Sequence, residues 1–151
     1  MLGINYLAVI AAAAAALVEG AVWYSPLLFG EAWMTLGGMD PGAMADAKIP
    51  IGAMIAEFVR SLVVAYVLAR FVVRLGIADW MGAVRLGLWV WIGFQAMAVA
   101  GSVIHENYPL QLYAIHAGDA LVKTLLMCVI LGVWRKASFF GQAGSASRGA
   151  E

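Results

Sequence analysis

Residues 2–23 read LGINYLAVIAAAAAALVEGAVW and contain no charged side chain before Glu19. The hydrocarbon core of a bilayer is about 30 Å thick, and an α-helix of about 20 apolar residues crosses it. This stretch therefore predicts a first transmembrane helix that ends at Trp23. A cleaved signal peptide would begin with positively charged residues, which this stretch does not have, so we expect the helix to be retained.

The composition of the whole chain agrees with this prediction. Of its 151 residues, 64% are apolar and 12% are charged, whereas about a quarter of a soluble domain is charged. The mean hydropathy is +0.90, so too few polar residues are present to cover the surface of a soluble enzyme. Nine Lys and Arg balance nine Asp and Glu, so the chain lacks the basic surplus of a nucleic-acid-binding protein. The single cysteine, Cys128, cannot form an intrachain disulfide.

Three further stretches are long and apolar enough to cross a bilayer. They cover residues 51–73, 80–104 and 110–134, and with residues 2–23 they predict an all-α integral membrane protein with a bundle of four transmembrane helices. We expect residues 1–136 to form one membrane domain. Residues 137–151 are small and polar, which predicts a flexible tail.

The cations near the span ends and outside the spans predict the orientation of the bundle. The side that holds both termini carries Arg70, Arg74, Arg85, Arg135, Lys136 and Arg148, and the opposite side carries only Lys48. Because Lys and Arg accumulate on the cytoplasmic side, we expect both termini to be cytoplasmic. Aromatic residues lie at the predicted membrane boundaries, as is typical of membrane proteins.

The loop after the first span is the longest and predicts a short helix in the outer interface. Ser25 and Pro26 are typical of an N-cap followed by the first helical position, and Gly37 and Gly38 would end the helix. Its apolar side chains would lie in the membrane interface. The residues of this interface motif are Trp23, Tyr24, Ser25, Pro26, Phe29, Gly30 and Trp33.

The same region carries a resemblance to a known family. The stretch GAVWYSPLLFGEAWM at residues 20–34, preceded by NYL at 5–7 and followed by WIGF at 91–94, resembles the family called domain of unknown function 1761. The segments YAIHAG at 113–118 and GVW at 132–134 fit the end of that family. The resemblance implies a small bacterial membrane protein of about four helices, hence one of the cytoplasmic (inner) membrane, and no activity or site. It also implies an amide residue at position 116, where this chain has a histidine.

Apart from Arg70 and Arg85, which lie toward the inner ends of their spans, six ionisable residues lie within the predicted spans, all between the outer end and the middle of the membrane. They are Glu19, Glu57, Arg60, His116, Asp119 and Lys123. An ionised group in the hydrocarbon costs at least about 2.5–3.5 kcal/mol, and the i,i+3 and i,i+4 spacings favour pairing along one helix. We therefore expect these six residues to form a buried polar network. Its three carboxylates exceed its two fixed cations, which requires a bound proton, a charged histidine or water.

Two interpretations of this network remain open. Chains of carboxylates and histidines relay protons in pumps, which favours a small proton- or ion-coupled transporter or channel that uses Glu19, Glu57, Arg60, Asp119 and Lys123. Alternatively, the charges neutralise one another and hold the helices together.

A metal site is a further hypothesis. His105, Glu106, His116 and Asp119 are predicted near the outer ends of the last two spans, and this ligand set suits zinc or a similar ion. No spacing matches a defined metal motif, and a polar loop with a hydrogen-bonded histidine accounts for the same residues. The sequence has no phosphate-binding loop and no catalytic triad pattern, so we predict no cofactor and no catalytic residue. A membrane enzyme, which would rest only on the region of His105 and His116, is a third alternative that stays open.

These observations favour a non-enzymatic membrane protein, either a structural or accessory subunit or a self-associating bundle. Small residues at i,i+4 spacing allow close helix approach, for example in the Ala11–Ala16 run. We expect the partners to be the lipid bilayer and either further copies of the chain or a larger membrane-protein complex, and we expect no nucleic acid.

Overall fold

The computed structural model describes residues 3–40, 42 and 50–148, with side chains up to residue 134. Within these residues the chain contains helices and no strand. Its elements are α1 (Tyr6–Trp23), α2 (Gly30–Leu36), α3 (Ile51–Arg74), α4 (Trp80–Val90), η2 (Trp91–Ala96), α5 (Met97–His105) and α6 (Leu110–Arg148). Four segments of the described chain are helical, long and apolar enough to cross a membrane, at Tyr6–Trp23, Ile51–Arg74, Trp80–His105 and Leu110–Trp134. The prediction of four span-length helices is confirmed.

The first helix begins later than predicted. The Asn5 side chain accepts hydrogen bonds from the backbone N–H groups of Leu7 and Ala8, at 3.1 and 3.2 Å. Such a side chain satisfies the free donors of a helix start. The helix therefore begins at Tyr6 rather than at residue 2.

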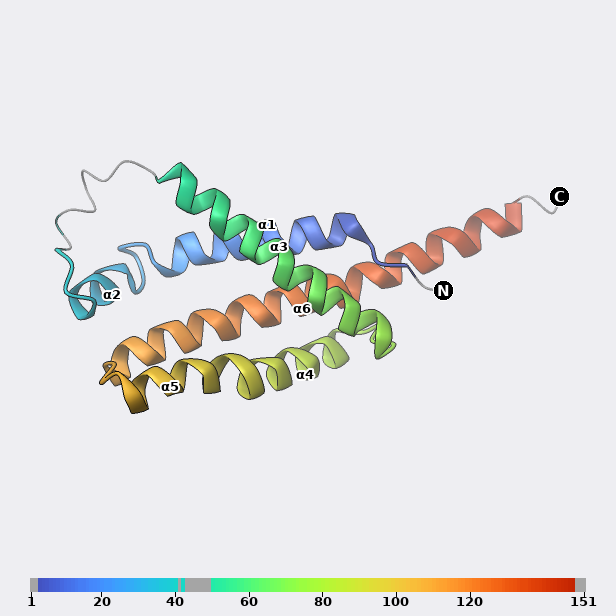
Figure 1. Ribbon diagram of the computed structural model, residues 1–151. Helices are drawn as coiled ribbons and strands as arrows, with labels where there is room; N and C mark the ends of the chain where they lie inside the picture. The colour runs from blue at the N-terminus through green and yellow to red at the C-terminus, as the bar shows by residue number, and fades with distance from the viewer. Residues whose placement is uncertain (1–2, 41, 43–49, 149–151) are drawn as a thin grey trace.

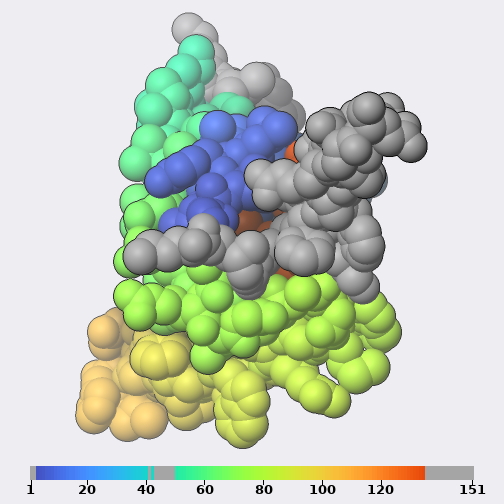
Figure 2. Space-filling model, turned by 90° about the vertical axis from the view of Figure 1, so that its right-hand side faces the viewer, coloured from blue at the N-terminus to red at the C-terminus, as the bar shows by residue number. Residues whose placement is uncertain are grey.

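Helix α6 is the centre of the bundle. It contacts α1, α3, α4, η2, α5 and α2, and Figure 1 shows it between the layer of α1 and α3 and the layer of α4 and α5. The N- and C-terminal ends lie at the same end of the bundle (Figure 1), and Figure 2 views the molecule from that end, with the start of α1 in blue above α4 in yellow-green.

Alanines make up about half of the core, so the helices approach closely. Ala12, Ala13 and Ala16 of α1 and Ala65 of α3 are fully buried. A Cβ added at Gly132 of α6 would come within 2.9 Å of the Ala83 Cβ on α4. Helices in lipid associate through such close packing, and this packing places the polar residues of the spans within reach of one another.

The third span is one continuous helix with a π-helical segment. Residues 80–105 run through α4, η2 and α5 without a break (Figure 1). In η2, Trp91 donates from Nε1 to the carbonyl oxygen of Ala117 at 2.7 Å, and Gln95 accepts a 2.8 Å hydrogen bond from Thr124. The π-helical turn thus directs two polar side chains at α6.

The predicted helix cap at Ser25 is wrong. Residues 24–29 form turns, and α2 begins at Gly30. The backbone N–H of Phe29 donates to the carbonyl oxygen of Trp23, and that of Gly30 donates to Ser25, so these residues fold back on the end of α1 instead of starting a helix. A Cβ at Gly30 would clash with the Tyr24 carbonyl oxygen, so this fold-back requires glycine.

Of two further predicted boundaries, the end of the short helix agrees with the structure and the start of the tail does not. Helix α2 ends at Leu36 and is followed by Gly37 and Gly38, as predicted, with Gly38 at a φ of 71°. The sequence predicts a flexible tail over 137–151, whereas α6 continues as a helix through Arg148. The flexibility of this segment stays a prediction.

Candidate functional site

Three carboxylates of the spans meet around Lys123, near the middle of the span-length part of α6 (Leu110–Trp134). Its ammonium nitrogen lies 2.8 and 3.0 Å from the two carboxylate oxygens of Asp119, one helical turn earlier. The same nitrogen lies 3.8 Å from Glu57 Oε1 on α3 and 3.9 Å from Glu19 Oε2 on α1. One cation thus faces three carboxylates from three helices.

The close packing of α1 against α6 leaves room for the ammonium group at this position. A Cβ at Gly20 of α1 would come within 2.9 Å of Lys123 Nζ and 3.2 Å of its Cε. The absence of a side chain at Gly20 leaves the space that the lysine occupies. Lys123 and Asp119 are each only 8% exposed, so their charges are removed from solvent and depend on each other.

Glu19 is the least satisfied member of the network. Both of its carboxylate oxygens are buried and have no hydrogen-bond partner among the described residues. Its nearest cation is Lys123, whose nitrogen also holds Asp119. A buried carboxylate without hydrogen bonds is costly, so Glu19 is where the excess of carboxylates over cations is concentrated.

Glu57 and Arg60 extend the network to the surface of α3. Arg60 Nε donates to Glu57 Oε2 at 2.8 Å, and a second guanidinium nitrogen donates to the other carboxylate oxygen. The Arg60 side chain is nevertheless 60% exposed, and that of Glu57 is 34% exposed. The prediction that Arg60 is buried in the bundle is wrong, because Arg60 lies about 60° around the axis of α3 from Glu57, which is enough to turn its side chain to the outer surface of the helix.

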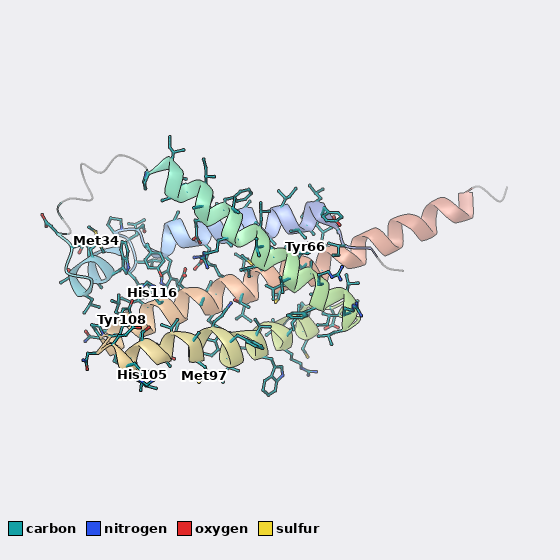
Figure 3. All side chains as sticks on the ribbon, viewed as in Figure 1. Met34, Tyr66, Met97, His105, Tyr108 and His116 are labelled. Carbon is teal, nitrogen blue, oxygen red and sulfur yellow. The ribbon has the colours of Figure 1, made fainter. Side chains whose placement is uncertain are left out.

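His116 lies beside the network and is bonded to Tyr24 instead of a charged group. The Tyr24 hydroxyl and His116 Nδ1 are 2.8 Å apart, and the Tyr24 ring lies 6.0 Å from Lys123 Nζ. Figure 3 shows His116 on the side of α6 that faces α2. Burial raises the pKa of the Tyr24 hydroxyl above its ordinary range, and the nearby Asp119 and Glu19 carboxylates raise it further. Tyr24 is therefore a neutral hydrogen-bonding group.

Aromatic residues of the interface motif cover the end of this site that lies toward α2. The Trp23 and Phe29 rings are 4.7 Å apart, and the Tyr24 and Trp33 rings meet edge to face at 5.3 Å. Trp23 donates from Nε1 to the Ile115 carbonyl oxygen at 3.1 Å. Ser25 and Pro26 lie in the turn that connects these rings. The motif thus packs on α6, and its place in the membrane interface stays a prediction.

The predicted metal ligands do not form a cluster. Among the described residues, no three His, Cys, Asp or Glu side chains are placed to hold a metal ion together. His105 and Glu106 are exposed at the end of α5, where Figure 3 labels His105. His116 is hydrogen-bonded to Tyr24, and Asp119 is paired with Lys123. The structure gives the metal hypothesis no support.

Four contacts of the site were not predicted from the sequence. They are the indole bonds of Trp23 and Trp91 to α6, the Tyr24–His116 bond and the Gln95–Thr124 bond. Gln95 and Thr124 are uncharged polar residues in apolar spans, and this sequence pattern could have identified them as candidate partners. The indole bonds end on backbone carbonyls and leave no sequence signal.

Four helices long and apolar enough to span a membrane, with charged side chains that meet around Lys123, indicate a small multi-pass membrane protein of the helical-bundle class. Residues 7–132 match the model of the family described as Protein of unknown function (DUF1761). The chain therefore belongs to this family, as the resemblance indicated. No curated protein and no solved structure matches the chain.

Proposed function

We propose that this protein is a non-enzymatic membrane bundle that works by association, as a structural or accessory subunit or as a self-associating unit. The observation that carries the proposal is the position of Lys123, whose ammonium group faces carboxylates on α1, α3 and α6. A cation placed in this way attracts the three helices to one point. Such paired charges hold helices together without a path for an ion.

The charges near the span ends and outside the spans support an orientation with both termini in the cytoplasm of a bacterial cell. The six cations on the side of the termini agree with the rule that Lys and Arg stay in the cytoplasm, and the two ends of the chain lie at one end of the bundle (Figure 1). A thiol-reactive probe that cannot cross membranes is expected to leave a cysteine added near the C-terminus unlabelled in intact cells. Labelling of that cysteine from outside would contradict the orientation.

Substitution of Asp119 by asparagine tests the structural role. Asp119→Asn removes the closest anion from Lys123, so we expect a lower yield of folded protein and a less stable bundle. Asp79→Asn is the matched control, because Asp79 caps α4 through the Gly82 N–H, at 2.8 Å, and asparagine caps helices equally well. Equal yields and stabilities of the two variants would contradict the proposal. Purification in native lipid then separates a subunit that keeps a partner from a self-associating bundle.

A second candidate is a small proton- or ion-coupled transporter, and Glu19 favours it. Its buried oxygens have no hydrogen-bond partner among the described residues, and Asp119 and Lys123 adjoin it. A group in this state is suited to take up and release a proton. The two candidates differ in whether the protein carries a current.

A further inference from the structure

Arg60 presents a charge on the membrane-facing side of α3. It lies nine residues after Ile51, which at 1.5 Å per residue places it about 14 Å along the helix. Its side chain is 60% exposed, although α3 is one of the span-length helices. An exposed guanidinium at this depth is unfavourable in hydrocarbon, so this surface of the bundle requires a polar cover.

The residues around Arg60 form a surface suited to another helix. Arg60 is aligned with Gly52, Ala56, Val63 and Val67, at successive spacings of four, four, three and four residues. All five are exposed, and no atom lies within 4 Å of a Cβ added at Gly52. This spacing keeps side chains on one face of a helix, and the small residues at 52 and 56 allow close approach. In Figure 1 the first half of α3, in blue-green, lies at the outer edge of the bundle.

The charge pattern of this surface is self-complementary. Glu57 and Arg60 are bonded to each other and differ in depth by about 4.5 Å, which is within the reach of an arginine side chain. In a two-fold dimer, the same surface of each copy meets the other. Arg60 of each copy can then reach Glu57 of the other, which gives an alternating array of four charges with no excess of either sign.

We propose that the α3 surface formed by Gly52, Ala56, Arg60, Val63 and Val67 binds a second copy of this chain, with reciprocal Arg60–Glu57 ion pairs across the dimer. A lipid phosphate on Arg60 is the competing occupant. It would satisfy the guanidinium, but it would leave Glu57 beside a further anion. The inference deepens the proposed function, because it specifies which surface associates and with what.

Cysteine cross-linking in lipid tests the dimer directly. Gly52→Cys is compared with Gly93→Cys, since both glycines are exposed within spans and neither Cβ would meet an atom within 4 Å. A disulfide requires Cα atoms within about 7 Å, and the native Cys128 is buried. At one protein per several thousand lipids, we expect oxidation to cross-link Gly52→Cys at least tenfold more than Gly93→Cys. Ala56→Cys repeats the test if Gly52→Cys does not fold.

Removal of the charge then tests the ion pairs. Arg60→Gln in the Gly52→Cys background is expected to reduce cross-linking at least tenfold, while Arg70→Gln, on the same helix near its inner end, leaves it unchanged. Circular dichroism of each variant reports whether the helices are intact. Equal cross-linking at positions 52 and 93, or no effect of Arg60→Gln on a folded protein, overturns the inference. If Arg60→Gln instead reduces only the amount of anionic lipid that co-purifies, the surface binds lipid and the inference is also overturned.

The outcomes separate this inference from the proposed function. A protein that stays monomeric and carries no current overturns the α3 dimer and leaves the proposed function standing. A current carried by the wild-type protein overturns the proposed function, whatever the cross-linking shows.

Discussion

Replacement of Lys123 by methionine is expected to destabilise the bundle more than any other single substitution in the network. Methionine has a similar length and carries no charge. At an effective dielectric constant of about 20, the attraction between the ammonium group and Asp119 at 2.8 Å is about 6 kcal/mol, and each contact near 4 Å adds about 4 kcal/mol. Desolvation offsets most of this attraction, and removal of one partner from a buried ion pair costs about 3–5 kcal/mol. We therefore expect Lys123→Met to lower the free energy of unfolding by about 3–5 kcal/mol.

The assay is unfolding in mixed micelles of a mild detergent and dodecyl sulfate. Tryptophan fluorescence follows it, because the indoles of Trp23 and Trp91 both donate to carbonyls of α6 and lose these contacts when the helices separate. The double variant Lys123→Met with Asp119→Asn should recover part of the loss, since it removes an anion that the single variant leaves unpaired. A loss below about 1 kcal/mol for Lys123→Met, or a double variant less stable than the single one, would refute the reasoning.

Two further predictions concern packing and hydrogen bonding. Gly132→Ala should lower the free energy of unfolding by about 1–3 kcal/mol, because its Cβ would lie 2.9 Å from the Ala83 Cβ. Gly101→Ala is the control: open space surrounds its Cβ, so this variant should be neutral or more stable by up to about 1 kcal/mol. Equal effects of the two substitutions in the same unfolding assay would show that α4 and α6 are not in close contact. Tyr24→Phe should cost about 0.5–1.5 kcal/mol through the lost hydrogen bond to His116. Because burial raises the pKa of Tyr24 above its ordinary value of 10.0, the unfolded chain loses this proton first, and the stability of the wild type should fall as the pH rises above 10. This decline should be weaker in Tyr24→Phe, and an identical decline would contradict the assigned environment.

The sequence predicts the elements of the fold because they depend on local properties. A stretch such as residues 2–23 is apolar over the thickness of a bilayer wherever it lies in the bundle, and the four span-length helices follow from four such stretches. The pairing of Asp119 with Lys123 was also predictable, since it requires only an i,i+4 spacing on one helix.

The arrangement of the site depends on how each helix is rotated about its own axis, which local patterns do not determine. The exposure of Arg60 follows from the angle at which α3 meets α6. The bond between Trp91 and Ala117 depends on the π-helical turn at η2 and ends on a backbone carbonyl. The prediction of a helix cap at Ser25 failed for a related reason. The turn that replaces the helix start is hydrogen-bonded back to Trp23, and the residue types of Ser25 and Pro26 alone do not indicate this contact.

We claim that the buried charges hold the helices together and do not carry ions. The most direct measurement is proton flux into liposomes that contain the purified wild-type protein, driven by a pH gradient and a membrane potential and read with an entrapped pH dye. We predict the same flux as in protein-free liposomes, with and without Glu19→Gln. A flux above that level which Glu19→Gln abolishes, in a variant that retains its helices and its stability, would contradict the claim and establish the network as a proton pathway.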